Sequence, residues 1–328
     1  MHAIEAQRLR REFPGGVLAV EGLDLAIRQG EVFGFLGPNG AGKTTTVRML
    51  TTLLRPTSGT ARVGGFDVAA GAHEVRRIIG VALQEAGLDL LATGRELLTL
   101  QARLYGLRGS LPSRRATELL ELVGLTDAAD RRIKTYSGGM KRRLDLASAL
   151  IHGPRILFLD EPTGGLDPAS RHAIWEEVRH LNRTEGITVF LTTQYLEEAD
   201  VLVDRVAIID HGRIVAEGTP ESLKASIGAD VVTVDVSEEH LEEARRTLWD
   251  CEGVNDVRAD GSGLTLFVKE GSAVAPQVIR RLDRAQIRVG SVAVSRPSLD
   301  EVFLRATGSR LEGAEPPAQP REQEVEVS

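Results

Sequence analysis

The sequence predicts an α/β domain built on a largely parallel sheet, followed by a small α+β domain. Two observations indicate the first domain: short apolar runs alternate with longer helical stretches, and one run leads directly into a glycine-rich segment and a helix. The second domain is indicated by a change of pattern after about Pro220. The predicted divisions are residues 1–222, 228–307 and a disordered tail, 308–328, that is rich in Pro, Glu and Gln.

Three buried strands are expected in the α/β domain, each ending beside polar residues. The first is Val32–Leu36, which precedes the segment Gly37–Thr44 and a helix expected to run through Leu54 and to stop before Pro56. The other two are almost wholly apolar, as strands buried on both faces are. They are Ile156–Leu159, which ends at Asp160, and Ile187–Thr192, which ends at Gln194.

A hairpin and a helical insertion complete this domain. The hairpin is predicted where Val206–Ile209 and Ile214–Ala216 flank a turn of Asp210, His211 and Gly212. Residues 85–150 have helical periodicity and few strand signals, so we expect a helical subdomain inserted into the α/β core. Within it, Ser137-Gly138-Gly139 precedes a helix that runs to about Ile151.

The second domain is predicted to have the order βαββαβ, the split arrangement of ferredoxin-like folds. A last helix, Ser298–Thr307, follows. The predicted strands are 231–236, 254–258, 264–268 and 287–294, and the predicted helices are 238–249 and 275–285.

Composition excludes several classes of protein. The 328 residues carry a net charge of −7, which argues against general binding to nucleic acid, because such proteins usually present a basic patch. No apolar run approaches the roughly 20 residues that span a bilayer, and the charged N-terminus does not match a signal peptide. The single cysteine, Cys251, excludes a disulfide framework and fits a reducing compartment. We therefore expect a cytosolic chain that reaches a membrane only through a partner.

The glycine-rich segment matches the phosphate-binding pattern G-x-x-x-x-G-K-[ST]. Its glycines let backbone N–H groups point at phosphate oxygens, and the start of the following helix adds its dipole. Lys43 is expected to reach the β- and γ-phosphates, and the Thr44 hydroxyl to bind Mg²⁺. The predicted nucleotide-binding residues are Gly37, Pro38, Asn39, Gly40, Ala41, Gly42, Lys43, Thr44 and Thr45.

Asp160 and Glu161 follow a buried strand and form the acidic partner of this loop. Ligands of open α/β sheets bind at the carboxyl ends of strands, so we expect Lys43, Asp160-Glu161 and Gln194 to lie together. Asp160 is predicted to hold Mg²⁺, and Glu161 to polarise the attacking water. Catalytic roles are thus assigned to Lys43 and Glu161.

A second anion site is predicted at Tyr136-Ser137-Gly138-Gly139-Met140. Small residues at the start of a helix leave backbone N–H groups open to an anion. One nucleotide cannot plausibly use both this site and the first loop. The simplest arrangement is two chains placed head to tail, with each first loop covered by the Ser-Gly-Gly of the other.

These motifs and their order resemble the nucleotide-binding domain of ABC ATPases over the first two-thirds of the chain. The resemblance implies that Phe13 stacks on adenine, and that Gln84 contacts Mg²⁺ and senses a membrane partner. It also implies that Ser137–Gly139 form the signature loop and that Gly165-Leu166-Asp167 form the D-loop, so that Asp167 joins the nucleotide site.

Two positions depart from the family's pattern. Met140 replaces the glutamine that usually ends the signature. Gln194 occupies the place of the switch histidine, so the resemblance implies a catalytic role for Gln194. Glutamine can donate a hydrogen bond to a γ-phosphate, but it cannot carry a proton or a positive charge. We therefore expect hydrolysis to be slow or to depend more heavily on Glu161.

Three segments are similar to the daunorubicin-resistance type of ABC ATP-binding subunit: Tyr136–Leu146, Thr193–Asp200 and Pro297–Phe303. This similarity implies an ATPase that uses ATP and Mg²⁺, pairs with a second copy of itself and binds a separate permease at the cytoplasmic face of the membrane. It also implies export of a hydrophobic drug, antibiotic or lipid-like molecule.

Three alternatives remain open from the sequence. The chain could be an ABC-type ATPase that acts on nucleic acid or the ribosome, an importer subunit, or a regulatory subunit that binds nucleotide without turnover. Two features disfavour the first: the chain contains a single phosphate-binding loop, and the stretch before the signature contains no sustained heptads.

Overall fold

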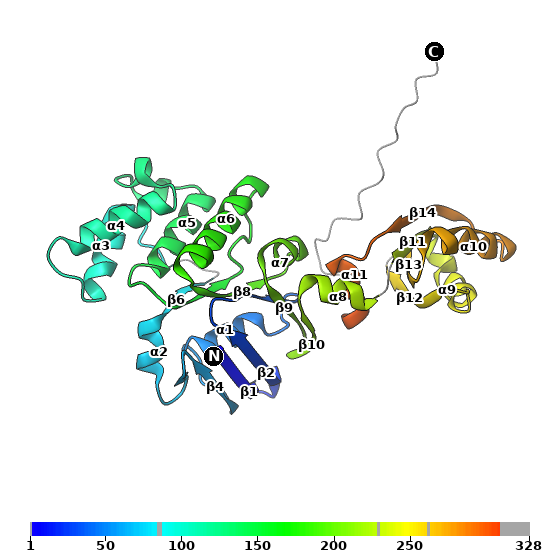
Figure 1. Cartoon of the computed structure of the whole chain (residues 1–328), viewed down its shortest axis with the longest axis horizontal. Helices are drawn as coiled ribbons and strands as arrows, with labels where there is room; N and C mark the ends of the chain where they lie inside the picture. The colour runs from blue at the N-terminus through cyan, green and yellow to red at the C-terminus, as the bar shows by residue number, and fades with distance from the viewer. Residues whose placement is uncertain (1, 84–86, 228–229, 261–262, 309–328) are drawn as a thin grey trace, which may run out of the picture. The chain divides into compact units, whose positions relative to one another are not determined.

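The computed structural model describes residues 2–83, 87–227, 230–260 and 263–308. The chain divides into two compact units, residues 1–227 and 228–328, and Figure 1 labels their helices and strands. The first unit contains two sheets and a group of helices. The second contains one sheet with its own helices. No helix among the described residues is long and apolar enough to cross a membrane.

A six-stranded sheet forms the centre of the first unit. Its strand order is β10-β9-β3-β8-β7-β6, and all neighbouring strands run parallel except β9 and β10. The strands are β3 (Val32–Leu36), β6 (Ile79–Ala82), β7 (Ile156–Asp160), β8 (Thr188–Thr193), β9 (Arg205–Asp210) and β10 (Arg213–Gly218). Every residue of β3, β7 and β8 is buried. The predicted parallel α/β core is therefore confirmed.

Strand register brings the predicted catalytic strand ends together. Leu36 pairs with Thr193, and Asp160 pairs with Thr192, so β3, β7 and β8 end side by side. The antiparallel pair β9–β10 turns through His211 and Gly212, whose φ angles are 44° and 77°. Positive φ at both turn residues matches the right-handed twist of the two strands, so the predicted hairpin is also confirmed.

Helix α1 (Lys43–Leu50) ends four residues earlier than we predicted. Thr52 adopts a φ of 67°, and the amides of Leu53 and Thr52 donate to the carbonyls of Arg48 and Met49, at 2.8 and 3.2 Å. These two bonds form a Schellman motif, which satisfies the last helical carbonyls and stops the helix. The expectation that Pro56 would end it was wrong, because this cap acts first.

An antiparallel sheet that we did not predict lies at the start of the chain. Its order is β2-β1-β4-β5, and the strands are β1 (His2–Phe13), β2 (Val17–Arg28), β4 (Ser58–Val63) and β5 (Phe66–Asp67). Buried residues of β1, β2 and β4 share one core with α1 and the inner face of the six-stranded sheet. Helix α1 is therefore held between the two sheets (Figure 1).

The remaining helices of this unit follow the strands in chain order. Helices α3, α4 and α5 form the helical part between β6 and β7, with two short 3₁₀ turns at Thr126–Ala128 and Ile133–Thr135. The helices are α2 (Ala72–Ile78), α3 (Gly94–Leu104), α4 (Leu111–Leu122), α5 (Gly138–Ala149), α6 (Pro168–Glu185), α7 (Leu196–Leu202) and α8 (Pro220–Ile227).

The second unit has the predicted βαββαβ order. Its antiparallel sheet has the order β12-β13-β11-β14, and one face buries a core of valine and leucine together with α9 and α10. The elements are β11 (Asp230–Val236), a 3₁₀ turn (Glu238–His240), α9 (Leu241–Trp249), β12 (Val254–Asp260), β13 (Gly263–Val268), α10 (Gly271–Arg284), β14 (Val289–Ser295) and α11 (Leu299–Thr307). The tail that we expected to be disordered lies outside the described residues from position 309 onward.

Candidate functional site

The glycine-rich loop between β3 and α1 borders a cavity of about 210 Å³. The lining residues are Ala19, Pro38, Asn39, Gly40, Gly42, Lys43, Thr44, Thr45 and Glu161. Among the predicted loop residues, Gly37 and Ala41 are not in this lining and instead hold the loop in place. The Gly37 amide donates to Thr193, and the Ala41 carbonyl accepts from Gly212 at 3.0 Å. Ala19, from β2, is a lining residue that we did not predict from the sequence.

Glycine is required at several points of this loop for different reasons. A Cβ at Gly37 would lie 2.4 Å from the carbonyl oxygen of Ile209. A Cβ at Gly42, where φ is 104°, would lie 2.4 Å from the carbonyl oxygen of Ala19. Gly40 has a φ of 81° but no atom within 4 Å of its Cβ position. The loop is therefore packed closely on its protein side and open at Gly40.

Replacing Gly42 by alanine should weaken both folding and nucleotide binding. The left-handed backbone alone costs an L-residue about 1–2 kcal/mol, and at Gly42 the contact with Ala19 is added to it. Gly40→Ala is the matched control, because it carries the same backbone cost without a contact. We expect urea unfolding and ATP titration to show a clearly larger loss for Gly42→Ala. Equal losses for the two variants would contradict the assigned close packing.

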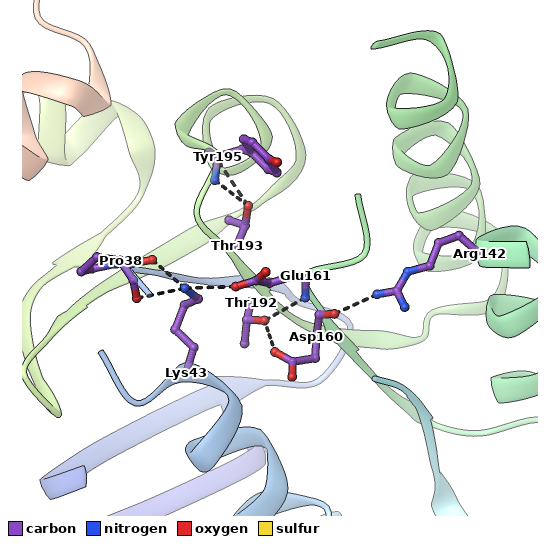
Figure 2. Close-up of polar contacts among 9 residues, drawn as sticks. Pro38, Lys43, Arg142, Asp160, Glu161, Thr192, Thr193 and Tyr195 are labelled. Carbon is purple, nitrogen blue, oxygen red and sulfur yellow. Dashed lines mark hydrogen bonds and ion pairs between the residues drawn. The ribbon is translucent and has the colours of Figure 1, made fainter. Parts of the chain in front are cut away.

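Lys43 joins the loop to the acidic end of β7. Its Nζ donates to the carbonyl oxygens of Gly37 and Pro38 at 2.7 and 3.1 Å, and it lies 3.2 Å from Glu161 Oε1 (Figure 2). The side chain is 4% exposed. Burial lowers the pKa of the Lys43 ammonium, while the carboxylates of Glu161 and Asp160 act in the opposite direction. A buried ammonium held at the mouth of the loop is suited to bind phosphate oxygens.

Thr192 of β8 orients the two acidic residues at the end of β7. Thr192 Oγ1 donates to Asp160 Oδ1 at 2.5 Å and accepts the Glu161 amide at 3.0 Å (Figure 2). Glu161 has a φ of 49°, an uncommon conformation for a residue with a Cβ. The chain turns sharply at this point, so the carboxylate of Glu161 faces Lys43 while that of Asp160 stays buried. Thr192 is thus a positioning residue that we did not predict.

The donor set fits a divalent cation such as Mg²⁺. Asp160 Oδ2 is buried and has no hydrogen-bond partner among the described residues, so a hard oxygen ligand is left available. Thr44, whose hydroxyl would be the second protein ligand, lines the same cavity. The predicted third metal contact, Gln84, lies outside the described residues.

Arg142 connects the helical part to the catalytic strand. From α5, its guanidinium donates to the carbonyl oxygen of Asp160 at 2.8 Å (Figure 2). It also donates to the carbonyl oxygens of Pro162 and Leu83, at 2.9 and 2.6 Å. In the sequence, Arg142 stands between the basic residues Lys141 and Arg143, a run that predicts a solvated face or an intersubunit contact. The solvated interpretation is wrong for Arg142, because its side chain is 11% exposed and its N–H groups donate to backbone carbonyls.

Burial destabilises the ionised form of Asp145 more than the attraction to Arg142 stabilises it. The atoms lie 3.4 Å apart, and burial raises the pKa of the Asp145 carboxyl from 3.8 to about 6 despite the nearby cation. Because the folded state holds this proton more tightly, unfolding releases it between about pH 4 and 6. Stability contributed by this group is therefore present at low pH and is lost as pH rises through 6.

Asp145→Asn should consequently stabilise the chain at neutral pH. The shift corresponds to roughly 2–3 kcal/mol above pH 6.5 and to almost nothing near pH 4. Urea unfolding of the wild type and the variant at both pH values measures the difference. A stability difference that does not change with pH would show that the pKa of Asp145 is the same in the folded and the unfolded chain.

The signature loop begins α5 and does not line the cavity of its own chain. Ser137 caps the helix by accepting the Met140 amide at 3.2 Å, and Ser137 and Gly138 are exposed. A Cβ at Gly139 would lie 2.9 Å from Ser170 Oγ, a residue in the first turn of α6. Asp167 caps α6 and accepts the Ser170 amide at 3.0 Å. The signature and D-loop segments therefore lie next to each other, away from the Lys43 cavity.

Two other predicted residues lie near the site without lining the cavity. Gln194 follows the last residue of β8 and is half-buried. Phe13 ends β1, and the guanidinium of Arg11 lies 4.7 Å from the centre of its ring. An aromatic ring at this strand end remains a predicted adenine contact, as Gln194 remains a predicted γ-phosphate contact.

Comparison with known proteins gives two matching family models. The model described as "ABC transporter" matches residues 20–164, and the model described as "ATP-binding protein DrrA1-3-like, C-terminal domain" matches residues 218–307. The chain is 46% identical to the daunorubicin resistance ATP-binding protein DrrA2 of Streptomyces coeruleorubidus, covering 96% of this chain and 98% of that protein. It is 37% identical to the linearmycin resistance ATP-binding protein LnrL of Bacillus subtilis, over 94% and 99% of the two chains.

Solved structures agree with these matches. The dimeric ATP-binding cassette MJ0796, in a post-hydrolysis state bound to ADP and Pi, superposes with a TM-score of 0.61 at 25% identity. The match covers 66% of this chain and 98% of that one. The cassette cbiO1 of Clostridium perfringens, part of an ABC transporter complex, superposes with a TM-score of 0.64 at 25% identity, over 76% and 95% of the two chains.

Proposed function

The chain belongs to the ABC transporter ATP-binding proteins, and from this premise we propose that it hydrolyses ATP to drive export of a hydrophobic drug or antibiotic through a separate membrane permease. The ATPase assignment follows from the family. The cargo class is supported by the names of relatives that confer resistance to daunorubicin and linearmycin. The proposed location is the cytoplasmic face of the membrane, reached through the permease.

One observation carries the catalytic part of the proposal: a buried ammonium and a carboxylate meet at the phosphate-binding loop. Lys43 Nζ lies 3.2 Å from Glu161 Oε1, so the group that binds the γ-phosphate adjoins the group that takes a proton from water. Glu161 lines the cavity and is oriented through its amide by Thr192. Lys43 would leave Glu161 for the phosphate oxygens when ATP binds, freeing the carboxylate to accept the proton.

Asp160 and Thr44 are the residues proposed to hold Mg²⁺. When bound there, this ion would neutralise charge on the β- and γ-phosphates. The backbone amides of the loop and the start of α1 would hold the phosphate chain, while Gln194 would donate a hydrogen bond from its amide to the γ-phosphate. Because this amide cannot take up a proton, proton acceptance is assigned to Glu161 alone.

A second copy of the chain is proposed to complete the site. Ser137 and Gly138 are exposed at the start of α5, and none of the signature residues lines the cavity among the residues that the structure describes. Their helix start can therefore meet a phosphate only on another molecule. The dimeric form of the cassette MJ0796 supports the pairing of two such chains.

Reconstituted transport tests the proposal directly. The chain is co-expressed with the proposed permease, and uptake of daunorubicin into inside-out vesicles is measured with ATP and Mg²⁺. We expect uptake and ATP hydrolysis with the wild type and neither with Lys43→Ala. Hydrolysis at the rate of Lys43→Ala would favour the alternative of a subunit that binds nucleotide without turnover. ATP hydrolysis without daunorubicin uptake would support the ATPase assignment and exclude daunorubicin as the cargo.

The permease is proposed to bind the helical part at α3. Leu100 and Leu104 are one helical turn apart, and their side chains are 56% and 78% exposed. Burying a leucine stabilises an interface by about 1.5–3 kcal/mol, so Leu100→Gln together with Leu104→Gln should weaken permease binding at least about tenfold. Pull-down with the tagged permease measures it. Leu53→Gln, at an exposed leucine outside the helical part, is the control. If the double variant bound the permease as the wild type does, this face of α3 would be excluded as the permease-binding surface.

A further inference from the structure

Glu198 is a fully buried carboxylate that the proposed mechanism does not use. It lies in α7 and is 0% exposed. Its Oε1 accepts hydrogen bonds from Trp175 Nε1 at 2.9 Å and from Thr163 Oγ1 at 3.2 Å. Burial raises the pKa of this carboxyl, and the hydroxyl of Thr193, the Trp175 and Thr163 donors and the Arg171 guanidinium act in the opposite direction. A carboxylate is costly to bury, and replacing it by an apolar residue would remove that cost.

The partners of Glu198 come from three segments that carry proposed catalytic or nucleotide-binding residues. Thr163 lies two positions after Glu161. Trp175 lies in α6, the helix that Asp167 caps. Thr193, the last residue of β8, comes immediately before Gln194. All three partners are at most 3% exposed, so their polar groups have little access to solvent.

A second contact joins two of these segments at the surface. The guanidinium of Arg171, in the first turns of α6, lies 4.4 Å from the ring centre of Tyr195. The Tyr195 amide in turn donates to Thr193 Oγ1 at 2.8 Å. Gln194 therefore lies between Thr193 and Tyr195, which bond to each other, and the Tyr195 ring contacts Arg171 of α6.

We propose that Glu198 is a positioning residue that sets the distance between the Glu161 turn, the α6 helix start and Gln194. The inference rests on the proposed roles of Glu161 and Gln194. A buried acceptor shared by two donors constrains both, since moving either segment leaves a buried donor unpaired. Glu198 touches neither nucleotide nor water in this account. Its effect is on the geometry of the groups that do.

Two substitutions of similar size separate hydrogen bonding from charge. Glu198→Gln keeps an oxygen that can accept from both Trp175 and Thr163, whereas Glu198→Met fills the space without an acceptor. A misplacement of catalytic groups by about 1 Å can cost about 100-fold, so we expect Glu198→Met to lower kcat at least about tenfold while KM for ATP changes less than about twofold. Glu198→Gln should keep more than about half of the wild-type kcat. Glu185→Met, at an exposed carboxylate near the end of α6, is the control.

A second set of variants leaves the acid in place. Thr163→Val and Trp175→Phe remove the two donors while keeping the shape of each side chain. If the shared acceptor matters, Glu198→Met should add little to the loss of kcat caused by the double donor variant. Three outcomes would each overturn the proposal. The losses of kcat could be fully additive, KM could rise while kcat stays unchanged, or Glu198→Gln and Glu198→Met could lower kcat equally.

Fluorescence gives a readout that does not need turnover. The chain has two tryptophans, so Trp249→Phe leaves Trp175 as the sole emitter. We expect ATP to change Trp175 emission in this background and with Glu198→Gln, and to leave it unchanged with Glu198→Met, although nucleotide binding measured by equilibrium dialysis stays the same. An ATP response that persists with Glu198→Met overturns the proposal. If the wild type hydrolysed ATP no faster than Lys43→Ala while the fluorescence pattern stayed as expected, the proposed ATPase function would be contradicted. The positioning role of Glu198 would not be.

Discussion

Glu161→Gln is expected to lower ATP turnover at least about 100-fold, because it removes the proposed proton acceptor. Glutamine has nearly the same shape, and its amide oxygen can still accept from Lys43 Nζ, which lies 3.2 Å from Glu161 Oε1. The backbone turn at residue 161 should also be kept, because its φ of 49° is equally unfavourable for glutamate and glutamine. ATP binding should therefore remain. Phosphate release, measured in the presence of the permease, gives the change in turnover.

The same variant should accumulate as an ATP-bound dimer. ATP bound at the proposed shared site contacts both chains, and its hydrolysis removes the γ-phosphate that joins them. A chain that binds ATP without cleaving it should therefore stay paired. Size-exclusion chromatography with ATP and Mg²⁺ should show a dimer for Glu161→Gln and a larger monomer fraction for the wild type. Glu176→Gln, at an exposed carboxylate of α6, should behave as the wild type. Wild-type turnover by Glu161→Gln would assign the proton acceptor to another group.

Mixing two inactive variants should restore activity if each site is shared between chains. Lys43→Ala destroys the phosphate-binding loop, and Gly138→Asp places a negative charge at the exposed signature loop. The aspartate should be tolerated by its own chain, because a Cβ at Gly138 would meet only Leu166, at 3.8 Å. Each variant alone has no intact site. A dimer of one chain of each kind has one intact site, made by the loop of Gly138→Asp and the signature of Lys43→Ala.

The expected recovery has a definite size. Random pairing of equal amounts makes half of the dimers mixed, and each mixed dimer has one of its two sites intact, so the mixture should reach about a quarter of wild-type turnover. Mixing Lys43→Ala with Lys43→Ala,Gly138→Asp serves as the control and should recover nothing. A mixture that stays inactive, although chromatography shows mixed dimers, would mean that hydrolysis needs both sites or does not use shared ones. High activity of Gly138→Asp alone would remove the signature loop from the site.

The strands around the catalytic residues were predictable because their signals are local. Val32–Leu36 was predicted with the bounds that the structure has, and Ile156–Leu159 to within one residue, since a strand buried on both faces needs an unbroken apolar run. The antiparallel sheet at the start of the chain was missed although β1 alternates. Charged residues such as Arg8 and Arg10 interrupt it, and pairing with β4 lies more than forty residues away.

What the sequence determined by itself is the chemistry of the site: the phosphate-binding loop, the acidic pair after β7 and the signature at the start of α5 are each encoded by a few adjacent residues. Tertiary structure alone decided which other groups hold them. Thr192, Arg142 and Glu198 reach the site from β8, α5 and α7, through contacts that span 18 to 59 residues along the chain. The physical reason is that a buried hydrogen bond depends on which strands and helices pack together. The sequence around a single threonine, arginine or glutamate does not identify the residue to which it will bond.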